Sequence, residues 1–181
     1  MRLGEFYSVL AMIFAKNFND TLTNEDFEKI KKSKGWVVKN ESENNKNGAK
    51  FYDDFLQNEI LAELRTDFRA IKERFRAGFY FQSASDDLQK FYKSINFNPK
   101  MGEVDSISNQ LLLIATILKN ELDETHQKLL VSFLTGFFLP YAVPLSLDLM
   151  QISKSSFYKS MGYFLAEFCQ NLQEIFKIKK G

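Results

Sequence analysis

Apolar residues recur at helical spacing from the start of the chain. The first stretch follows the pattern i, i+3, i+4, i+7, i+8 at Phe6, Val9, Leu10, Ile13 and Phe14. This pattern predicts an amphipathic helix from about Leu3 to Lys16 that docks on a core. A secretory signal peptide would carry basic residues before its apolar run, whereas Glu5 stands there and no small-x-small cleavage site follows. The segment is therefore interpreted as part of the folded domain.

Polar residues separate this helix from the next apolar stripe. Asn24 is a candidate N-cap for a short helix with acidic residues early and lysines late, and Gly35 ends it. Residues 39–50 are polar, Asn-rich and without periodicity, which predicts a flexible surface loop. A long helix is then predicted from Phe51 to Arg76, with a bend near Gly78. Its inward stripe would consist of Phe51, Phe55, Ile60, Leu61, Leu64, Phe68, Ile71 and Phe75.

The second half of the chain contains four further helical blocks. Residues 83–95 predict a helix capped by Ser83 or Ser85, and residues 105–122 predict a nearly all-apolar helix capped by Asp105 or Ser106. Two more helices are predicted over about 124–152 and 155–178. Alternating β-branched runs are absent from the sequence, so no strand is expected. The chain of 181 residues is thus predicted to be all-α, as a single-domain helical bundle of about seven or eight helices.

The segment Leu129–Leu147 contains nineteen residues without a charge. About 20 apolar residues are enough to cross a bilayer, so length alone would permit a membrane span. Pro140 and Pro144 argue against a straight span because each removes a backbone hydrogen bond. The preferred interpretation is a buried central helix broken into two pieces around Pro140.

Composition narrows the classes of function. The sequence has 19 Phe and 7 Tyr, which can form a core or line an apolar groove with few polar atoms to satisfy. Its net charge is +1, whereas a nucleic-acid-binding protein usually carries a basic excess, so no nucleic-acid partner is expected. A single cysteine, Cys169, excludes an internal disulfide and fits a reducing cytoplasm.

Catalytic constellations are not visible in the sequence. It has no Gly-rich phosphate loop, no dinucleotide-binding fingerprint, no HExxH and no GxSxG. The one histidine, His126, is expected to be an exposed residue in the first turn of a helix, and Cys169 is expected to pack in the core. We therefore expect a non-enzymatic protein without catalytic residues, cofactor or metal site.

Two stretches place characteristic residues in a recognisable order. Residues 102–118 (GEVDSISNQLLLIATIL) put Asp105 between an acidic loop and an apolar helix. Residues 133–168 begin with Phe-Leu, continue with Pro140–Tyr141 and end with a helix that contains Phe157–Tyr158. In order and spacing they resemble the TorD/DmsD family of redox-enzyme maturation chaperones.

Individual positions match that family unevenly. Asp105 matches the family's aspartate, Ser106 stands where a histidine is usual, and Gln110 stands where a glutamate is typical. The segment Tyr80–Ser83 (YFQS) falls where the family has a proline-aromatic-x-Ser turn, but the proline is missing. The resemblance therefore indicates a divergent branch of the family.

The resemblance implies an all-helical cytoplasmic chaperone for a molybdopterin oxidoreductase, such as a formate dehydrogenase or a dimethyl sulfoxide/trimethylamine N-oxide reductase type enzyme. Such a chaperone binds the client's twin-arginine signal peptide, and sometimes its body, before cofactor insertion and export. The peptide calls for an apolar groove and for carboxylates that bind guanidinium groups. The candidate client-binding residues are Phe68, Tyr80, Ser83, Glu103, Asp105, Ser106, Gln110 and Tyr141.

Other interpretations remain open at the level of sequence. Asp105 could serve as a helix cap, as a client-binding residue or as both, and Tyr141 and Phe157–Tyr158 are expected to pack in the core. The whole protein could instead be a helical scaffold or regulatory interaction protein without an export client, or a membrane-associated protein. The expected oligomeric state is a monomer or a domain-swapped dimer.

Overall fold

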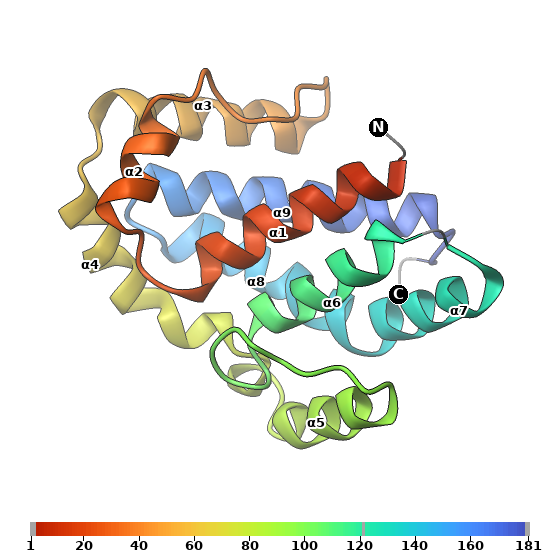
Figure 1. The fold of residues 1–181 in the computed structure, drawn as a ribbon. Helices are drawn as coiled ribbons and strands as arrows, with labels where there is room; N and C mark the ends of the chain where they lie inside the picture. Colours follow the sequence, from red (N-terminus) through yellow and green to blue (C-terminus); the bar gives the residue numbers. More distant parts are fainter. Residues whose placement is uncertain (1–2, 121, 180–181) are drawn as a thin grey trace. The chain divides into compact units, whose positions relative to one another are not determined.

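The computed structural model describes residues 3–120 and 122–179, and the regular elements in these ranges are helices (Figure 1). Two short 3-10 helices, η1 (Lys72–Phe75) and η2 (Ala77–Phe79), and a π-helical turn, η3 (Leu134–Phe138), accompany the α-helices. The α-helices are α1 (Leu3–Asn19), α2 (Asn24–Lys31), α3 (Glu43–Asn58), α4 (Leu61–Ile71), α5 (Ala84–Ser94), α6 (Ile107–Lys119), α7 (Glu124–Phe133), α8 (Leu139–Ile152) and α9 (Ser156–Ile175). Because α7, η3 and α8 are continuous, the described residues form eight helical segments, which confirms the predicted all-α class.

The chain divides into two compact units, each made from two separate stretches. The first unit contains the chain up to Asn19 together with Glu73–Tyr141, and the second contains Asp20–Lys72 together with the chain from Ala142 onward. Since the chain passes between the units three times, neither unit is continuous in sequence. The expectation of a single domain stays a prediction.

In the first unit, α1 packs along α6 in the antiparallel direction (Figure 1). The Ser8 hydroxyl donates to the carbonyl of Ala115 at 2.8 Å. One helical turn nearer the start of α1, Gly4 lies so close to α6 that a Cβ would be 2.8 Å from the Leu118 carbonyl oxygen. The predicted first helix is confirmed, but its buried face is shifted, because Val9 points outward while Ala11 is buried.

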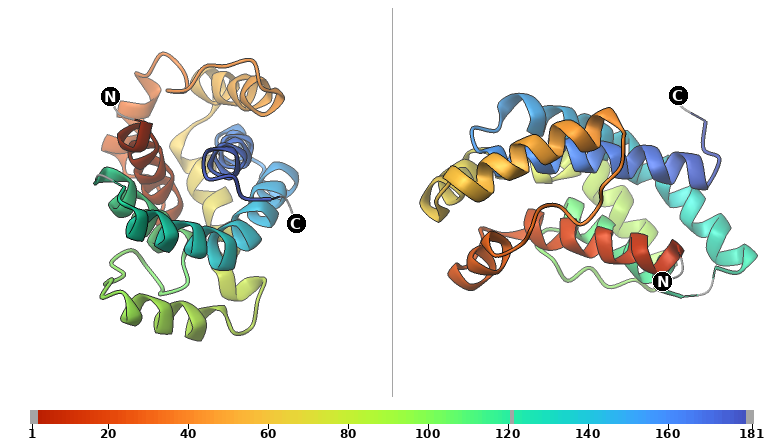
Figure 2. Two further views of the ribbon diagram at one scale, coloured as in Figure 1. Left: turned by 90° about the vertical axis from the view of Figure 1, so that its right-hand side faces the viewer. Right: turned by 90° about the horizontal axis from the view of Figure 1, so that it is seen from above.

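In the second unit, α3 runs along α9, also antiparallel (Figure 2). Aromatic rings fill this pair: Phe51 contacts Tyr163 at 5.7 Å between ring centroids, and Trp36 stacks on Phe164 at 4.3 Å. Gly48 permits this packing, since a Cβ there would lie 2.5 Å from the Phe164 ring. Large aromatic side chains therefore fill the contact between α3 and α9.

The prediction of a flexible loop over residues 39–50 is wrong for most of its length. Helix α3 begins at Glu43, with Ser42 as its N-cap, whose hydroxyl accepts from the Asn45 N–H at 3.0 Å. Buried Glu167 on α9 accepts hydrogen bonds from side chains of this segment, namely Asn40 Nδ2, Ser42 Oγ and Asn45 Nδ2. Asn40 and Asn45 donate hydrogen bonds to the buried carboxylate of Glu167. Because Glu167 is so distant in sequence, the local composition of residues 39–50 does not reveal this contact.

The single long helix predicted from Phe51 to Arg76 is also wrong. The chain leaves the helix at Glu59 and Ile60, both in extended backbone, and resumes as α4. The Glu59 carboxylate accepts from the N–H groups of Ser156 and Phe157, the first residues of α9. The interruption therefore places Glu59 at a helix N-terminus, where its charge is favourable, and leaves Ile60 exposed.

The predicted helix caps agree with the structure to different degrees: Ser106, one of the two candidates for α6, is confirmed, whereas Asn24 is not the cap of α2. Thr23, and not Asn24, caps α2, since its hydroxyl accepts from the Asp26 N–H at 3.1 Å. Ser106 caps α6 by accepting from the Asn109 N–H at 3.2 Å. Ser83 precedes α5 but makes no capping hydrogen bond through its side chain.

The run Glu124–Ile152 is helical throughout, so the predicted break at Pro140 is wrong. The π-helical turn η3 ends shortly before this proline, and the N–H of Leu139 donates to the carbonyl of Leu134. The change of hydrogen-bond register accommodates Pro140, which lacks an N–H.

Within the described ranges, Glu124–Ile152 is the one helix long and apolar enough to cross a membrane, and half of its most apolar window is buried in the fold. The core helix of a folded domain meets the same criteria of length and composition.

Candidate functional site

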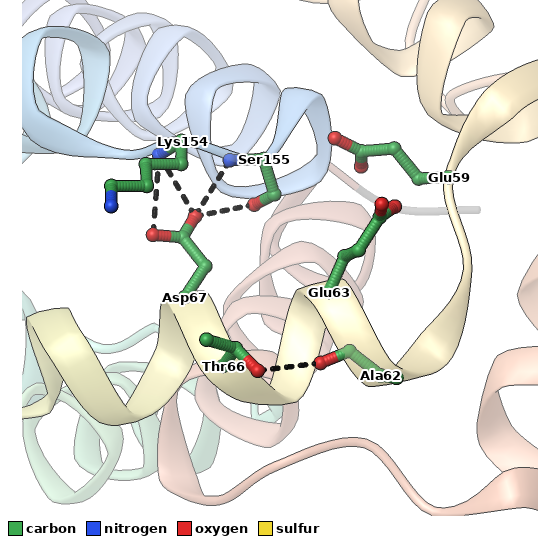
Figure 3. Close-up of a pocket in the computed structure, with 7 residues that line it drawn as sticks. All are labelled: Glu59, Ala62, Glu63, Thr66, Asp67, Lys154 and Ser155. Atoms are coloured by element: carbon green, nitrogen blue, oxygen red, sulfur yellow. Dashed lines mark hydrogen bonds between the residues drawn. The ribbon is translucent and has the colours of Figure 1, made fainter.

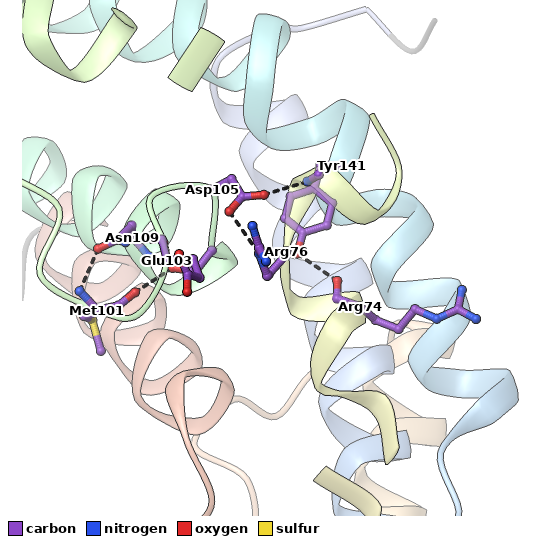
Figure 4. Close-up of polar contacts among 9 residues, drawn as sticks. Arg74, Arg76, Met101, Glu103, Asp105, Asn109 and Tyr141 are labelled. Atoms are coloured by element: carbon purple, nitrogen blue, oxygen red, sulfur yellow. Dashed lines mark hydrogen bonds and ion pairs between the residues drawn. The ribbon is translucent and has the colours of Figure 1, made fainter. Parts of the chain in front are cut away.

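Asp105 lies at the start of α6 in the first unit and is fully buried. Its Oδ1 accepts from Arg76 Nε at 3.2 Å, and its Oδ2 accepts from the Gly78 N–H at 2.8 Å (Figure 4). Its carbonyl accepts from the Ala77 N–H at 3.0 Å. One interpretation of the sequence made Asp105 the cap of α6. In the structure its side chain does not cap this helix. It fastens the segment around η2 to the start of α6.

Glycine is required at position 78 by this arrangement. A Cβ on Gly78 would lie 2.7 Å from Asp105 Oδ2, well inside van der Waals contact. The carboxylate can approach the backbone closely only because position 78 has no side chain. The bend expected near Gly78 is thus a docking point for Asp105.

The loop before α6 is held by Asn109, which lies in the polar first turn of this helix, before its apolar run. Its Oδ1 accepts from the N–H groups of Lys100 and Met101 at 2.9 and 2.8 Å, and its Nδ2 donates to the Glu103 carbonyl at 2.8 Å. Sequence reasoning did not select Asn109. The signal that could have done so is the polar run Ser108–Gln110 directly before an apolar run, because a buried amide needs several hydrogen-bond partners.

The segment fastened by Asp105 carries three consecutive aromatic residues, Phe79, Tyr80 and Phe81, which we call the aromatic ridge. Phe79 is 49% exposed and Phe81 is 44% exposed. The guanidinium of Arg74 lies over the Phe79 ring at 4.1 Å from its centroid. Inside the ridge, Tyr80 contacts Tyr141 at 5.4 Å between ring centroids. Large exposed rings at adjacent positions are typical of binding surfaces.

Tyr141 supports the ridge from within the first unit. It is buried, as predicted, and its hydroxyl donates to the Arg74 carbonyl at 2.9 Å (Figure 4). Burial raises the pKa of this phenol well above its ordinary value, so the hydroxyl stays protonated and remains a donor. Tyr141 thus fixes the backbone that carries Arg74.

The remaining candidate client-binding residues differ in their exposure and in the unit to which they belong. Glu103 and Ser83 are exposed in the first unit. Gln110 is fully buried on α6, and neither its Oε1 nor its Nε2 has a hydrogen-bond partner among the described residues. Phe68 belongs to the second unit, where it packs against Tyr158 at 5.9 Å between ring centroids. Its place in a groove with Tyr80 and Tyr141 stays a prediction.

A pocket of about 460 Å³ in the second unit contains three carboxylates (Figure 3). Asp67 accepts from the N–H groups of Lys154 and Ser155, and from the Ser155 hydroxyl at 2.6 Å. Glu59 accepts from the N–H groups of the next two residues, Ser156 and Phe157, and burial raises its pKa. Both acids serve the N-terminus of α9, so the fold itself uses them. Sequence reasoning missed this pair because its partners lie about ninety residues away.

Groups with reactive chemistry are occupied or buried. His126 is exposed in the first turn of α7, as predicted, with Nδ1 2.8 Å from Asp123 Oδ1. Cys169 is buried, as predicted, and burial raises the pKa of its thiol. Over residues 3–120 and 122–179, no group of three or more His, Cys, Asp or Glu side chains could hold a metal ion.

Comparisons with protein-family models, with curated proteins and with solved structures found no match for this chain.

Proposed function

We propose that this protein is a cytoplasmic chaperone for the maturation of a molybdopterin-containing oxidoreductase, and that it binds the client's twin-arginine signal peptide or the apo-enzyme before cofactor insertion and export. The observation that carries the proposal is the aromatic ridge, held rigidly by buried Asp105. The order of motifs around Asp105, Pro140–Tyr141 and Phe157–Tyr158, which resembles the TorD/DmsD family, supports the choice of client.

The ridge has the chemistry that a twin-arginine peptide requires. Aromatic faces attract guanidinium groups, and Phe79 already holds the guanidinium of Arg74 in this way. The rings also offer apolar area for the hydrophobic run that follows the two arginines in such a peptide. Exposed Glu103 adds a carboxylate in the loop fastened by Asn109.

Asp105 has a positioning role in this proposal and does not touch the client. Its two carboxylate oxygens accept from Arg76 and Gly78, and its side chain has no exposed area. Asp105→Ala is therefore expected to lower both folding stability and peptide affinity, because the ridge loses its anchor. A change confined to affinity would instead make Asp105 a direct ligand.

The decisive experiment uses a synthetic peptide with two adjacent arginines followed by an apolar helical run, titrated into the purified protein by calorimetry. The double variant Phe79→Ser/Phe81→Ser should weaken binding by about tenfold or more, since central aromatic residues dominate binding energies. Glu103→Gln should weaken it less. Ile60→Ser is the matched control, because Ile60 is an exposed apolar residue in the second unit.

Two peptide controls separate the contributions. Replacing both arginines by lysine should reduce affinity, since lysine lacks the planar guanidinium that stacks on rings. Replacing the apolar run by Gly and Ser should reduce it further. Equal binding of all three peptides would overturn the proposal.

In cells, the tagged protein should capture a molybdoenzyme precursor that carries a twin-arginine signal, and deletion of that signal should weaken the capture. Capture that is indifferent to the signal peptide would favour a helical scaffold without an export client. Fractionation without detergent tests the remaining alternative, because a membrane-associated protein would stay with the membranes.

A further inference from the structure

The outward face of α1 in the first unit borders an open groove of about 800 Å³. Val9 is 52% exposed and Met12 is 39% exposed along this face. Met101, from the loop before α6, also lines the groove. Methionine side chains adapt to the shape of a partner, so the groove suits an inserted apolar side chain.

Charge is ordered along this face of α1. Glu5 stands at one end, Lys16 at the other, and Val9 and Met12 lie between them. The spacings of four, three and four residues keep all four side chains on one stripe of the helix. The stripe covers about three helical turns, or roughly 17 Å at 1.5 Å per residue.

This order is complementary to itself when the stripe is reversed. If a second α1 lies antiparallel against the first, Glu5 meets the partner's Lys16, and Val9 meets the partner's Met12. The two-fold symmetry repeats both contacts, which gives two ion pairs around an apolar centre. A parallel arrangement would bring Glu5 against the partner's Glu5, and Lys16 against the partner's Lys16. Charge therefore selects the antiparallel pairing.

We infer that this face of α1 binds a second copy of the chain, in an antiparallel homodimer in which Val9 and Met12 of each protomer insert into the groove of the other. This dimer exchanges no element between protomers, so it differs from the domain-swapped dimer considered from the sequence. It also does not use the aromatic ridge.

One charge opposes the pairing. Lys119 ends α6 and lines the groove at the Glu5 end, as the close approach of Gly4 to Leu118 shows. It would therefore lie near the partner's Lys16. Lys119→Gln removes this repulsion without touching the stripe, and it should lower the dissociation constant of the dimer. An unchanged or higher constant would contradict the antiparallel register of the two helices.

The test measures mass by sedimentation velocity over a range of concentrations. The wild type should shift from monomer to dimer as concentration rises. Glu5→Lys alone and Lys16→Glu alone should each weaken the dimer by about tenfold or more, because both symmetry-related pairs become repulsive. Mixing these two variants should restore association, since the side chain at position 5 of each protomer then meets an opposite charge at position 16 of the other.

The mixture distinguishes an interface from a folding effect. An acid in the first turn and a base in the last turn of α1 also suit the helix dipole, and charge reversal could weaken the helix itself. A folding defect would persist in the mixture, whereas a lost interface would be recovered. Circular dichroism of each variant confirms that helix content is retained.

Matched controls use the exposed pair Glu124 and Lys128 on α7, which belongs to the same unit. Glu124→Lys and Lys128→Glu should leave the dissociation constant unchanged. A wild type that stays monomeric at every concentration, or a mixture that fails to associate, would overturn the inference. Binding of the twin-arginine peptide is measured separately, so failure of the dimer leaves the proposed function intact.

Discussion

Two buried carboxylates hold irregular backbone in the two units, and they do so by different means. Asp105 in the first unit accepts from the guanidinium of Arg76 and from a backbone N–H. Glu167 in the second unit accepts from three neutral side chains of the segment before and within the first turn of α3, Asn40, Ser42 and Asn45. One carboxylate is neutralised by a cation, whereas the other depends on hydrogen bonds alone.

The two carboxylates differ in what their partners lose when the carboxylate is removed. The side chain of Arg76 is 42% exposed, so water can solvate this cation if the ion pair is broken. Asn45 is buried, and its Nδ2, which also donates to the Val38 carbonyl at 3.2 Å, loses one of its two acceptors if Glu167 is removed. A buried donor without an acceptor is destabilising by about 1–3 kcal/mol. We therefore expect the neutral network to be the more sensitive of the two.

The largest effect is expected from Glu167→Ala. The substitution leaves the donors of Asn40, Ser42 and Asn45 without this acceptor, and we expect it to lower the free energy of unfolding by about 3 kcal/mol. Urea denaturation measures the change. Glu174→Ala, an exposed position on the same helix, is the control. A loss for Glu167→Ala no larger than for this control would remove the contrast between the units.

Cys169 provides a second readout of the same substitution. It lies on α9 two residues after Glu167, is buried, and has a raised thiol pKa. A thiol reagent should therefore react only when this part of the second unit opens. Glu167→Ala should accelerate labelling, while Asp105→Asn, in the other unit, should accelerate it less. Equal acceleration would show that the two units open together.

An intermediate effect is expected from Asp105→Asn. Asparagine can still accept from the Gly78 N–H, but the ion pair with Arg76 is lost, so we expect stability to fall by about 2 kcal/mol. Amide hydrogen exchange at Ala77 and Gly78 should increase. If exchange there is unchanged while stability falls, Asp105 would not be the anchor of the aromatic ridge.

The smallest effects are expected at the two N-cap serines. Ser106 caps α6 and donates to the Met101 carbonyl, while Ser42 caps α3 and donates to Glu167. Replacing either by alanine should be destabilising by about 1 kcal/mol. The Ser42→Ala effect should shrink when Glu167 is already alanine, because the two residues are coupled. The Ser106→Ala effect should be the same in both backgrounds.

Helical periodicity predicted the fold class because it depends on residues close in sequence. The helical character of α1 and of the apolar run in α6 could be predicted from local spacing alone, although the exact buried face of α1 could not. Residues 39–50 and Glu59 were misjudged for the opposite reason. Their partners are Glu167 and the start of α9, over ninety residues away, and no local pattern contains that information.

The candidate site was partly accessible from the sequence. Asp105 and Tyr141 were selected by motif order, and the structure gives both of them contacts with the segment that carries Tyr80. The exposure of Phe79 and Phe81 could not be predicted, since phenylalanine is usually buried. Asn109 was overlooked because its role depends on the loop that it holds, and no local pattern identifies that loop as its partner.

The π-helical turn η3 sets the phase of the helix that follows it. Each residue of an α-helix rotates the chain by roughly 100°, so one extra residue in the turn redirects every later side chain. Tyr141, three residues after this turn, is one of these side chains, and its hydroxyl donates to the carbonyl of Arg74. The number of residues in this turn therefore determines the direction in which the later side chains of the helix point. A single-residue deletion there would keep the composition of the helix and yet turn Tyr141 away from the backbone that it supports.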